Sequence, residues 1–330
     1  MATEIKTWEI ISGKLKQIDI TLEENQRKER EDLEKWILTN QAILGEDIAL
    51  IGEQVQTKSG FIDFLGIDIN GNTVIVELKR NKIPREIISQ SIDYASDVSN
   101  WDIDKLGEIC RGFTSRSLED YFTECFSDIN LEDIVINNNQ RLLLVGFGIE
   151  EATSRMIEWL STNFSVSVNA VILNYSKTSS GNELLSRTVI IPEEVEKQKA
   201  NRKKFTIEMS NELGNYELDK LKDLITRYLN NSLKSARRIK DIFLPTLMSK
   251  DICTRDEILE EFVKSGEAKN KSEAGYFMSL ISGQLGHKWK DYLRQIIEYS
   301  YPNNEWEKDN FKIRNGYKDL VKSVLESLKD

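Results

Sequence analysis

Residues 60–82, GFIDFLGIDINGNTVIVELKRNK, place Asp63, Glu77 and Lys79 in or beside two apolar runs. The runs are rich in β-branched residues and are joined by Asn70 and Gly71, which predicts two strands of a hairpin. Alternate residues of a strand share a face, so Glu77 and Lys79 are neighbours on one face of the second strand. Whether Asp63 joins them depends on the turn.

Two turns are compatible with this sequence, and they give opposite results. A two-residue loop sets Asp63 opposite Leu78, on the wrong face, because a slip of one residue inverts every side chain. A three-residue loop ending in a left-handed Gly71 pairs Asp68 with Asn72 and therefore Asp63 with Glu77. We expect the second register.

In that register two carboxylates oppose each other across adjacent strands, and they repel unless a cation lies between them. Mg²⁺ or Mn²⁺, which prefer oxygen ligands, would suit the position. Lys79 would then hold a nucleophilic water or stabilise charge on a phosphate. The stretch is thus a candidate hydrolytic metal site.

The neighbouring sequence predicts an α/β unit over residues 1–195. Its expected helices have apolar residues at helical spacing, and its expected strands are short apolar runs. The helices are residues 21–44, 85–101 and 151–164, and the strands are residues 48–57, 60–69, 73–80, 141–149, 167–176 and 184–192.

Asp63, the hairpin, Glu77-Leu78-Lys79, and then Gln90 and Tyr94 in QSIDY resemble the PD-(D/E)xK nuclease superfamily, in its RecB-like and NucS-like branches. The resemblance covers residues 29 to about 100, and Ile62 stands where proline is usual. It implies a restriction-endonuclease-like mixed β-sheet flanked by helices. It also implies that the Asp and Glu bind Mg²⁺ and that the Lys and Gln take part in phosphodiester hydrolysis.

The resemblance further implies an acidic metal ligand on the preceding helix, where Glu29, Glu31 and Glu34 are available. If Leu33 and its apolar neighbours face inward, Glu29 lies within roughly 40° of that face and Glu31 nearly opposite, at ~100° per residue. Glu29 is the preferred candidate.

The charged stretch at residues 193–206 predicts a connection to a second domain, residues 196–330, which is mostly helical. Thr254 and Ser272 are expected to cap its last two central helices. Two strand-like runs follow within residues 292–317, separated by residues 302–304, and a final helix covers 317–328. This order is the outline of a winged helix-turn-helix. The predicted roles are DNA binding or dimerisation.

Basic residues in two stretches are candidates for nucleic-acid contact, since phosphate neutralisation supplies much of the affinity for nucleic acids. Tyr94 is counted with them. The alternative reading of each stretch is an ordinary solvated helix surface. The basic candidates are Arg80, Lys82 and Arg85 near the proposed metal and Lys234, Arg237 and Arg238 in the second domain.

Composition excludes several other classes of protein. The net charge of −10 argues against a general polyanion binder, although residues 201–330 carry a small positive excess. His287 is the single histidine, so histidine-based nucleophilic catalysis would have to pass through it. Three cysteines without CxxC spacing favour reduced thiols. With neither a leader nor an apolar span in the sequence, we expect a cytoplasmic protein without a membrane partner.

We therefore predict a Mg²⁺-dependent endonuclease that hydrolyses phosphodiester bonds in DNA, in restriction, repair or anti-phage defence. Two alternatives stay open. One is a nucleic-acid-binding protein that keeps the fold without the reaction. The other is a homodimeric assembly protein whose nuclease is dormant until a partner or ligand binds.

Overall fold

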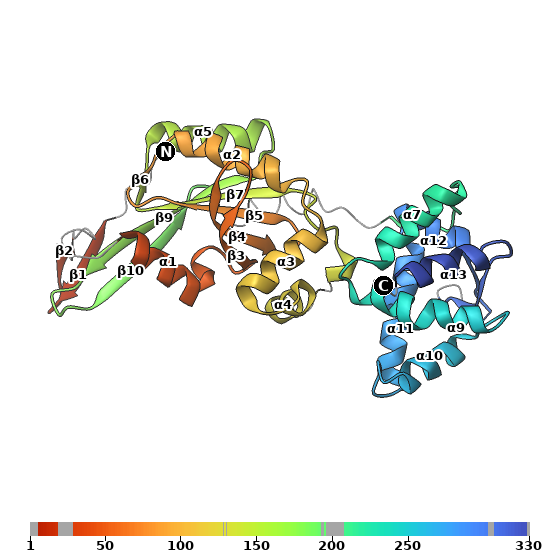
Figure 1. Ribbon diagram of the computed structural model, residues 1–330. Coiled ribbons are helices and arrows are strands. Elements are labelled where there is room, and N and C mark those ends of the chain that lie inside the picture. Colours follow the sequence, from red (N-terminus) through yellow and green to blue (C-terminus); the bar gives the residue numbers. More distant parts are fainter. Residues whose placement is uncertain are drawn as a thin grey trace. The chain divides into compact units, whose positions relative to one another are not determined.

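The computed structural model describes residues 6–18, 29–127, 129, 131–192, 195, 208–302 and 307–328. The chain divides into two compact units, Met1–Phe205 and Thr206–Asp330, called unit 1 and unit 2 below (Figure 1). Across the described ranges, no helix is both long enough and apolar enough to cross a membrane.

Unit 1 is built on a six-stranded mixed sheet, as predicted. Its strand order is β10-β9-β7-β5-β4-β3. The β5–β7 and β7–β9 pairs are parallel and the other three are antiparallel. Central strands are buried on both faces, which explains their continuous apolar runs. The strands are β3 (Ile48–Gln56), β4 (Phe61–Asp68), β5 (Thr73–Leu78), β7 (Gln140–Gly146), β9 (Val168–Lys177) and β10 (Glu183–Val189).

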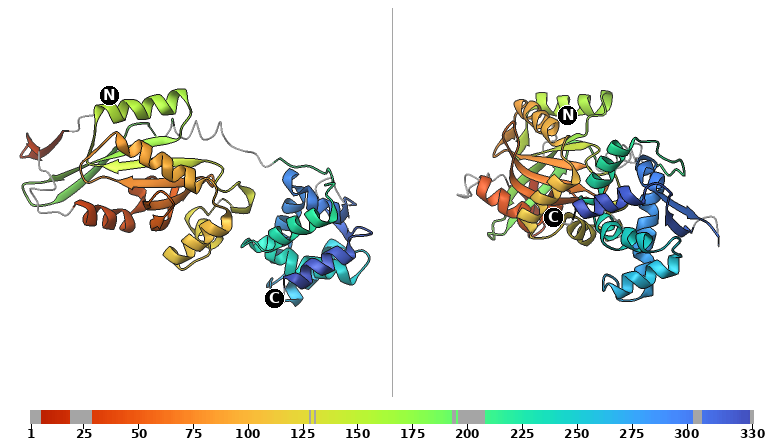
Figure 2. Two further views of the ribbon diagram at one scale, coloured as in Figure 1. Left: turned by 45° about the horizontal axis from the view of Figure 1, so that its top comes forward. Right: turned by 45° about the vertical axis from the view of Figure 1, so that its right-hand side comes forward.

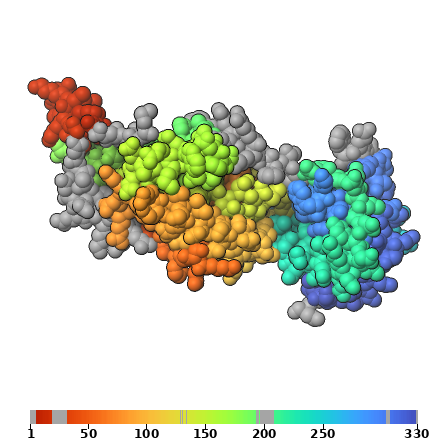
Figure 3. All heavy atoms as spheres, turned by 90° about the horizontal axis from the view of Figure 1, so that it is seen from above, coloured from red at the N-terminus to blue at the C-terminus, as the bar shows by residue number. Residues whose placement is uncertain are grey.

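Helices cover both faces of this sheet. On one face the apolar core contains side chains of α2 (Glu86–Val98), α3 (Ile103–Thr114), α4 (Leu118–Cys125) and α5 (Glu151–Asn163). The other face packs against α1 (Glu29–Thr39), which is followed by the short helix η2 (Gln41–Ile43). Figure 2 shows α1 and α2 on opposite sides of the sheet. In the space-filling view, α2 (orange) and α5 (yellow-green) form one continuous surface (Figure 3).

Several elements of unit 1 were not predicted. A hairpin of β1 (Thr7–Ile11) and β2 (Lys14–Ile18) precedes the sheet, and its Ile10 and Leu15 are 74% and 70% exposed. Helices α3 and α4 and the turn η3 (Leu131–Asp133) also fall between predicted elements. A short parallel pair joins β6 (Lys82–Ile83) to β8 (Gly148–Ile149).

The β4–β5 turn has the predicted three-residue form. Phe64 pairs with Val76 and Ile67 with Thr73, while the amide of Asp68 donates to the Asn72 carbonyl at 2.9 Å. Gly71 has φ +83°, which a residue with a Cβ rarely adopts. A Cβ there would also lie 3.0 Å from the carbonyl oxygen of Val135. The register prediction is confirmed, and continuing it by one residue sets Asp63 opposite Glu77.

Unit 2 is mostly helical and carries one β-hairpin, as predicted. Cys253 forms an isolated antiparallel bridge with Phe311, and two of the helices follow it in the chain. The predicted hairpin is confirmed, although Asn303 and Asn304 at its predicted centre lie outside the described residues. The helices are α7 (Leu218–Leu229), α8 (Lys234–Arg238), the π-helical η4 (Ile239–Phe243), α9 (Leu244–Ser249), α10 (Arg255–Lys264), α11 (Lys271–Gly286), η5 (Lys288–Lys290), α12 (Asp291–Ile296) and α13 (Lys318–Ser327), and the strands are β11 (Ile297–Ser300) and β12 (Asp309–Ile313).

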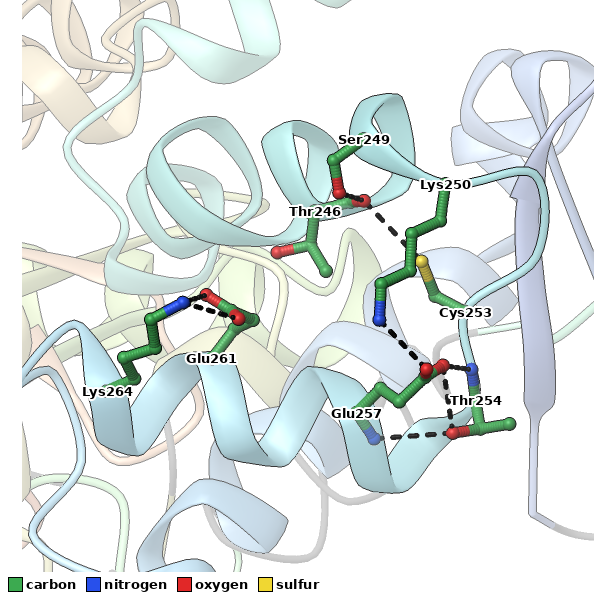
Figure 4. A network of polar contacts seen from close by, with 8 residues as sticks. All are labelled: Thr246, Ser249, Lys250, Cys253, Thr254, Glu257, Glu261 and Lys264. Carbon is green, nitrogen blue, oxygen red and sulfur yellow. Dashed lines mark hydrogen bonds and ion pairs between the residues drawn. The ribbon is translucent and has the colours of Figure 1, made fainter.

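One predicted helix cap in unit 2 is right and the other is wrong. Thr254 caps α10, because its hydroxyl accepts from the Glu257 amide while the Glu257 carboxylate accepts from the Thr254 amide at 2.8 Å (Figure 4). At α11 the cap is Asn270, whose side chain accepts from the Glu273 amide at 3.0 Å, and Ser272 lies inside the helix. Serine and asparagine are both favourable N-cap residues, so residue type alone did not show which of the two positions begins the helix.

Candidate active site

A pocket of about 600 Å³ lies where β4 begins and β5 ends. Most residues predicted to act in catalysis or to contact phosphate line this pocket, together with Leu33 of α1 and Gln54 of β3. The predicted residues on the pocket wall are Asp63, Glu77, Lys79, Arg80, Lys82 and Gln90.

Asp63 is held at the point where the two strands separate. The ladder of backbone pairs between β4 and β5 ends at Phe64 and Val76, and the backbone amide of Leu78 donates to Asp63 Oδ2 at 2.8 Å. The carboxylate of Asp63 therefore bonds directly to the strand that carries Glu77. This contact fixes the first predicted metal ligand against the second strand.

Glu77 is a buried carboxylate with an unsatisfied oxygen. Its residue is 2% exposed, and among the described residues Oε1 has no hydrogen-bond partner. The other oxygen lies 3.7 Å from Lys79 Nζ. The pKa of Glu77 is raised to about 7, mainly by burial and then by the negative charge of Asp63, while the charge of Lys79 opposes both effects. A buried acceptor without a donor is costly unless a ligand binds it.

The donor set fits a hard divalent cation. Two facing carboxylates, one with an orphaned oxygen, supply the oxygen ligands that Mg²⁺ and Mn²⁺ prefer. Within the described part of the chain, no group of three or more His, Cys, Asp or Glu side chains could hold a metal ion. The side chains of Glu29 and Glu31 lie outside that part, and Glu34 is half-buried on α1.

Gln90 and Tyr94 form a pair on α2. Gln90 lines the pocket and donates from Nε2 to the Tyr94 hydroxyl at 2.8 Å. Tyr94 is only 4% exposed and packs beneath Gly60, where an added Cβ would lie 3.0 Å from its hydroxyl. The prediction that Tyr94 contacts nucleic acid is therefore wrong, because its ring is covered. It supports Gln90 instead.

The predicted basic contacts near the pocket are on its surface. Arg80 and Lys82 are exposed and line the pocket. Arg85 is the residue before α2, and its guanidinium pairs with the Glu86 carboxylate at 3.0 Å, with both side chains largely exposed. These side chains remain accessible to a phosphate backbone.

The basic stretch in unit 2 is not uniformly accessible. Arg238 is 7% exposed, its guanidinium lies 3.5 Å from the centre of the Phe277 ring, and it pairs with Glu267 at 2.9 Å. The prediction that Arg238 contacts nucleic acid is wrong, because the side chain holds α8 against α11. Arg237 is exposed but pairs with the same Glu267, and Lys234 is half-buried.

His287 plays no part in the pocket. It is 5% exposed in unit 2, directly after α11. Burial lowers its pKa to about 4, and the charges of Lys290, Arg294 and Lys308 act in the same direction. Because it is the only histidine, acid–base chemistry at the pocket would fall on carboxylates, lysine and water.

Gln54 is the pocket residue that sequence reasoning missed. It donates from Nε2 to Asp63 Oδ1 at 3.1 Å, and its backbone has φ +48° within β3. Glycine or asparagine is the usual signal for such a backbone, so nothing in the strand pattern of residues 48–57 marked this position.

The part of the chain that contains this pocket is similar to known proteins of one family. Residues 29–142 match the family described as the endonuclease NucS C-terminal domain. Endonuclease NucS of Aeropyrum pernix is 40% identical over 68 residues, which are 20% of this chain and 26% of that protein. Endonuclease NucS of Pyrococcus horikoshii is 31% identical over 81 residues, covering 24% of this chain and 30% of that protein. The chain thus aligns with less than a third of each of these two relatives.

Two solved structures are also similar to part of the chain. A repair endonuclease from Pyrococcus abyssi has a TM-score of 0.26 and 20% identity, covering 40% of this chain and 43% of that chain. An EndoMS–dsDNA2 complex has a TM-score of 0.26 and 17% identity, covering 42% of each chain. By the family match and the two sequence relatives, residues 29–142 are similar to the C-terminal domain of NucS endonucleases.

Proposed function

We propose that the chain is a divalent-metal-dependent endonuclease that hydrolyses phosphodiester bonds in DNA. The observation that supports it most directly is the pocket in which Asp63, Glu77 and Lys79 meet, with one buried Glu77 oxygen lacking a partner among the described residues. The similarity of residues 29–142 to a NucS endonuclease domain supports the same reaction class. The proposal includes DNA as the substrate and restriction, repair or anti-phage defence as the setting of the reaction.

Asp63 and Glu77 would hold Mg²⁺ or Mn²⁺, with Glu29 as the preferred third carboxylate. The cation, when bound, supplies Lewis-acid polarisation of a phosphoryl oxygen and lowers the pKa of a bound water. Lys79 directly follows β5 and lines the same pocket with a side chain that is 31% exposed, so its ammonium can stabilise negative charge that develops on the phosphate. Gln90, held by Tyr94, can orient Lys79 or a phosphate oxygen without carrying charge.

The surface residues Arg80, Lys82 and Arg85 would contact the nucleic-acid backbone. Each is basic and exposed, and the first two line the pocket itself. Contacts of this kind position a strand without reading its sequence. These contacts would therefore hold DNA near the carboxylates without selecting a particular base sequence.

We propose that unit 2 selects the substrate through α11, with homodimerisation as the alternative. Tyr276 is 56% exposed on α11, and Arg255 of α10 contacts Ser279 and Ser282 of the same helix. Sedimentation of the full chain and salt-dependent DNA binding by a Tyr276→Ala variant distinguish the two roles. A monomer with weakened DNA binding in the variant supports substrate selection, and a dimer with unchanged DNA binding supports the alternative.

The reaction is tested by incubating the protein with supercoiled, linear, branched, mismatched and single-stranded DNA and with RNA. Each substrate is presented with Mg²⁺, Mn²⁺ or EDTA, and the product ends are mapped. We expect metal-dependent internal cleavage of at least one DNA substrate and none by Glu77→Gln. Cleavage that survives EDTA or Glu77→Gln would contradict the proposal. Nucleic-acid binding without cleavage would favour the non-catalytic alternative.

A further inference from the structure

The backbone of Gln54 is unusual for a strand. Strand residues normally have φ near −120 to −140°, whereas Gln54 has φ +48°. Its neighbours Glu53 and Val55 stay paired with Phe64 and Ile62, so the ladder continues on both sides of it. Among the other described non-glycine residues with positive φ, all are Ser or Asn, types with short polar side chains. A long side chain in this conformation is disfavoured and therefore calls for a compensating contact.

That contact is with the proposed metal ligand. The register of β3 and β4 sets Gln54 opposite Asp63, and its amide donates to Asp63 Oδ1 at 3.1 Å. The Leu78 amide donates to the other oxygen, Oδ2, at 2.8 Å. Asp63 thus accepts hydrogen bonds from both neighbouring strands, β3 on one side and β5 on the other. Two donors on different oxygens fix the plane of the carboxylate.

The chemistry of the donor matters as much as its position. An amide is uncharged, so it restrains a carboxylate without neutralising it, whereas a lysine or arginine would compete with a cation for the same negative charge. Gln54 is exposed on the edge strand and lines the pocket, so burial in the apolar core does not account for its conformation.

We propose that Gln54 is a positioning residue that holds the Asp63 carboxylate in the orientation required to bind a divalent cation together with Glu77. This inference rests on the proposed function of the pocket. Partners that orient a metal ligand typically contribute 10–100-fold to metal affinity or activity. The left-handed backbone of Gln54 is the means by which an edge strand directs its amide at Asp63.

Three variants of the full chain separate this role from a structural one. Gln54→Gly removes the amide and also suits a positive φ, so it relieves the backbone. Gln54→Asn keeps an amide and tolerates the left-handed conformation, but its side chain is one methylene shorter. Gln56→Ala changes an exposed glutamine two residues along the same strand and serves as the matched control.

The measurements are calorimetric titration with Mn²⁺, thermal unfolding in EDTA, and single-turnover cleavage. For Gln54→Gly and Gln54→Asn we expect a dissociation constant for Mn²⁺ raised by roughly 10-fold or more, with a metal-free melting temperature equal to or above wild type. Gln56→Ala should match wild type. Variants that bind Mn²⁺ within twofold of wild type, or that melt well below it, would overturn the role of Gln54 while leaving the nuclease proposal intact. Wild-type protein that neither binds Mn²⁺ nor cleaves would overturn both.

Discussion

The two ends of the β4–β5 pair each carry a buried carboxylate, Asp68 at the turn and Glu77 at the pocket, and the surroundings of the two carboxylates are opposite in kind. At the turn, Asp68 is fully buried and accepts from the amides of Asn70 and Asn72 and from the Arg141 guanidinium, all within 3.0 Å. Arg141 also bonds to Asp47. At the pocket, Asp63 faces Glu77, whose Oε1 has no partner within the described chain.

The difference separates a carboxylate whose charge is satisfied within the protein from one that we propose to bind a cation. Asp68 meets a cation and several donors inside the protein, so its charge stabilises the turn. Glu77 is buried beside another carboxylate, with Lys79 as its opposing charge at 3.7 Å, so its ionised form costs free energy. We propose that this arrangement serves to bind a divalent cation, for which the two carboxylates supply suitable oxygen ligands.

The largest expected effect is on cleavage. Asp63→Asn or Glu77→Gln removes a metal ligand, so the single-turnover rate with Mg²⁺ should fall by roughly 10³-fold or more. Thermal unfolding in EDTA should show equal or higher stability, because each change removes carboxylate repulsion. If either variant is inactive because it has unfolded, or cleaves at the wild-type rate, the proposal that the pocket carboxylates act in cleavage and the turn carboxylate in stability would be contradicted.

The turn should show the reverse pattern. Asp68→Ala removes the fully buried carboxylate that accepts from Arg141 and from two turn amides, while Asp47 still pairs with Arg141, and we expect the free energy of unfolding to fall by about 3 kcal/mol. Asp93→Ala, at an exposed position of α2, is the control and should change stability by less than about 0.5 kcal/mol. Urea denaturation measures both. Loss of cleavage by folded Asp68→Ala with unchanged stability would run against our interpretation.

Lys79 should affect rate more than metal binding. Lys79→Ala removes a positioned charge from the pocket, and we expect single-turnover cleavage to slow by about 10²-fold. Lys82→Ala is a useful companion, since losing one phosphate contact should weaken DNA binding and reduce its salt dependence without slowing the bound complex. Equal loss of rate in both variants would indicate a general charge effect.

The smallest expected effect is on the pH dependence of stability. In metal-free protein the pKa of Glu77 is about 7, above its ordinary value of 4.5. The folded state therefore binds the Glu77 proton more tightly than the unfolded state does. The stability that this proton contributes is fully present below about pH 4.5 and is lost as pH rises through 7. Melting temperatures of wild type and Glu77→Gln in EDTA should diverge by a few degrees across this window. Parallel curves would refute the raised pKa.

The central hairpin could be predicted because its geometry follows from local rules. The left-handed glycine at position 71 selected the three-residue turn, and alternation then placed Glu77. The side chain of Gln54 could not be predicted, since its conformation depends on Asp63 across the strand pair. Tyr94 and Arg238 were misassigned for a similar reason: residue type suggests surface contact, while burial is decided by neighbouring elements.

Other differences come from weak or ambiguous patterns. The β1–β2 hairpin exposes much of its apolar surface, so its alternation does not mark a core face. Residues 292–297 were expected to begin a strand, yet α12 covers Asp291–Ile296 and is buried along most of its length. A short apolar run that is buried on all sides lacks the periodicity that separates helix from strand.

The contrast between the two ends is tested most directly by calorimetric titration of Mn²⁺ into metal-free protein. We predict that wild type and folded Asp68→Asn bind Mn²⁺ with similar affinity, and that binding is lost in Glu77→Gln. Circular dichroism beforehand would establish that all three proteins are folded. Undiminished Mn²⁺ binding by Glu77→Gln, or its absence from wild type, would contradict the assignment of a divalent-cation site to the Asp63–Glu77 pocket.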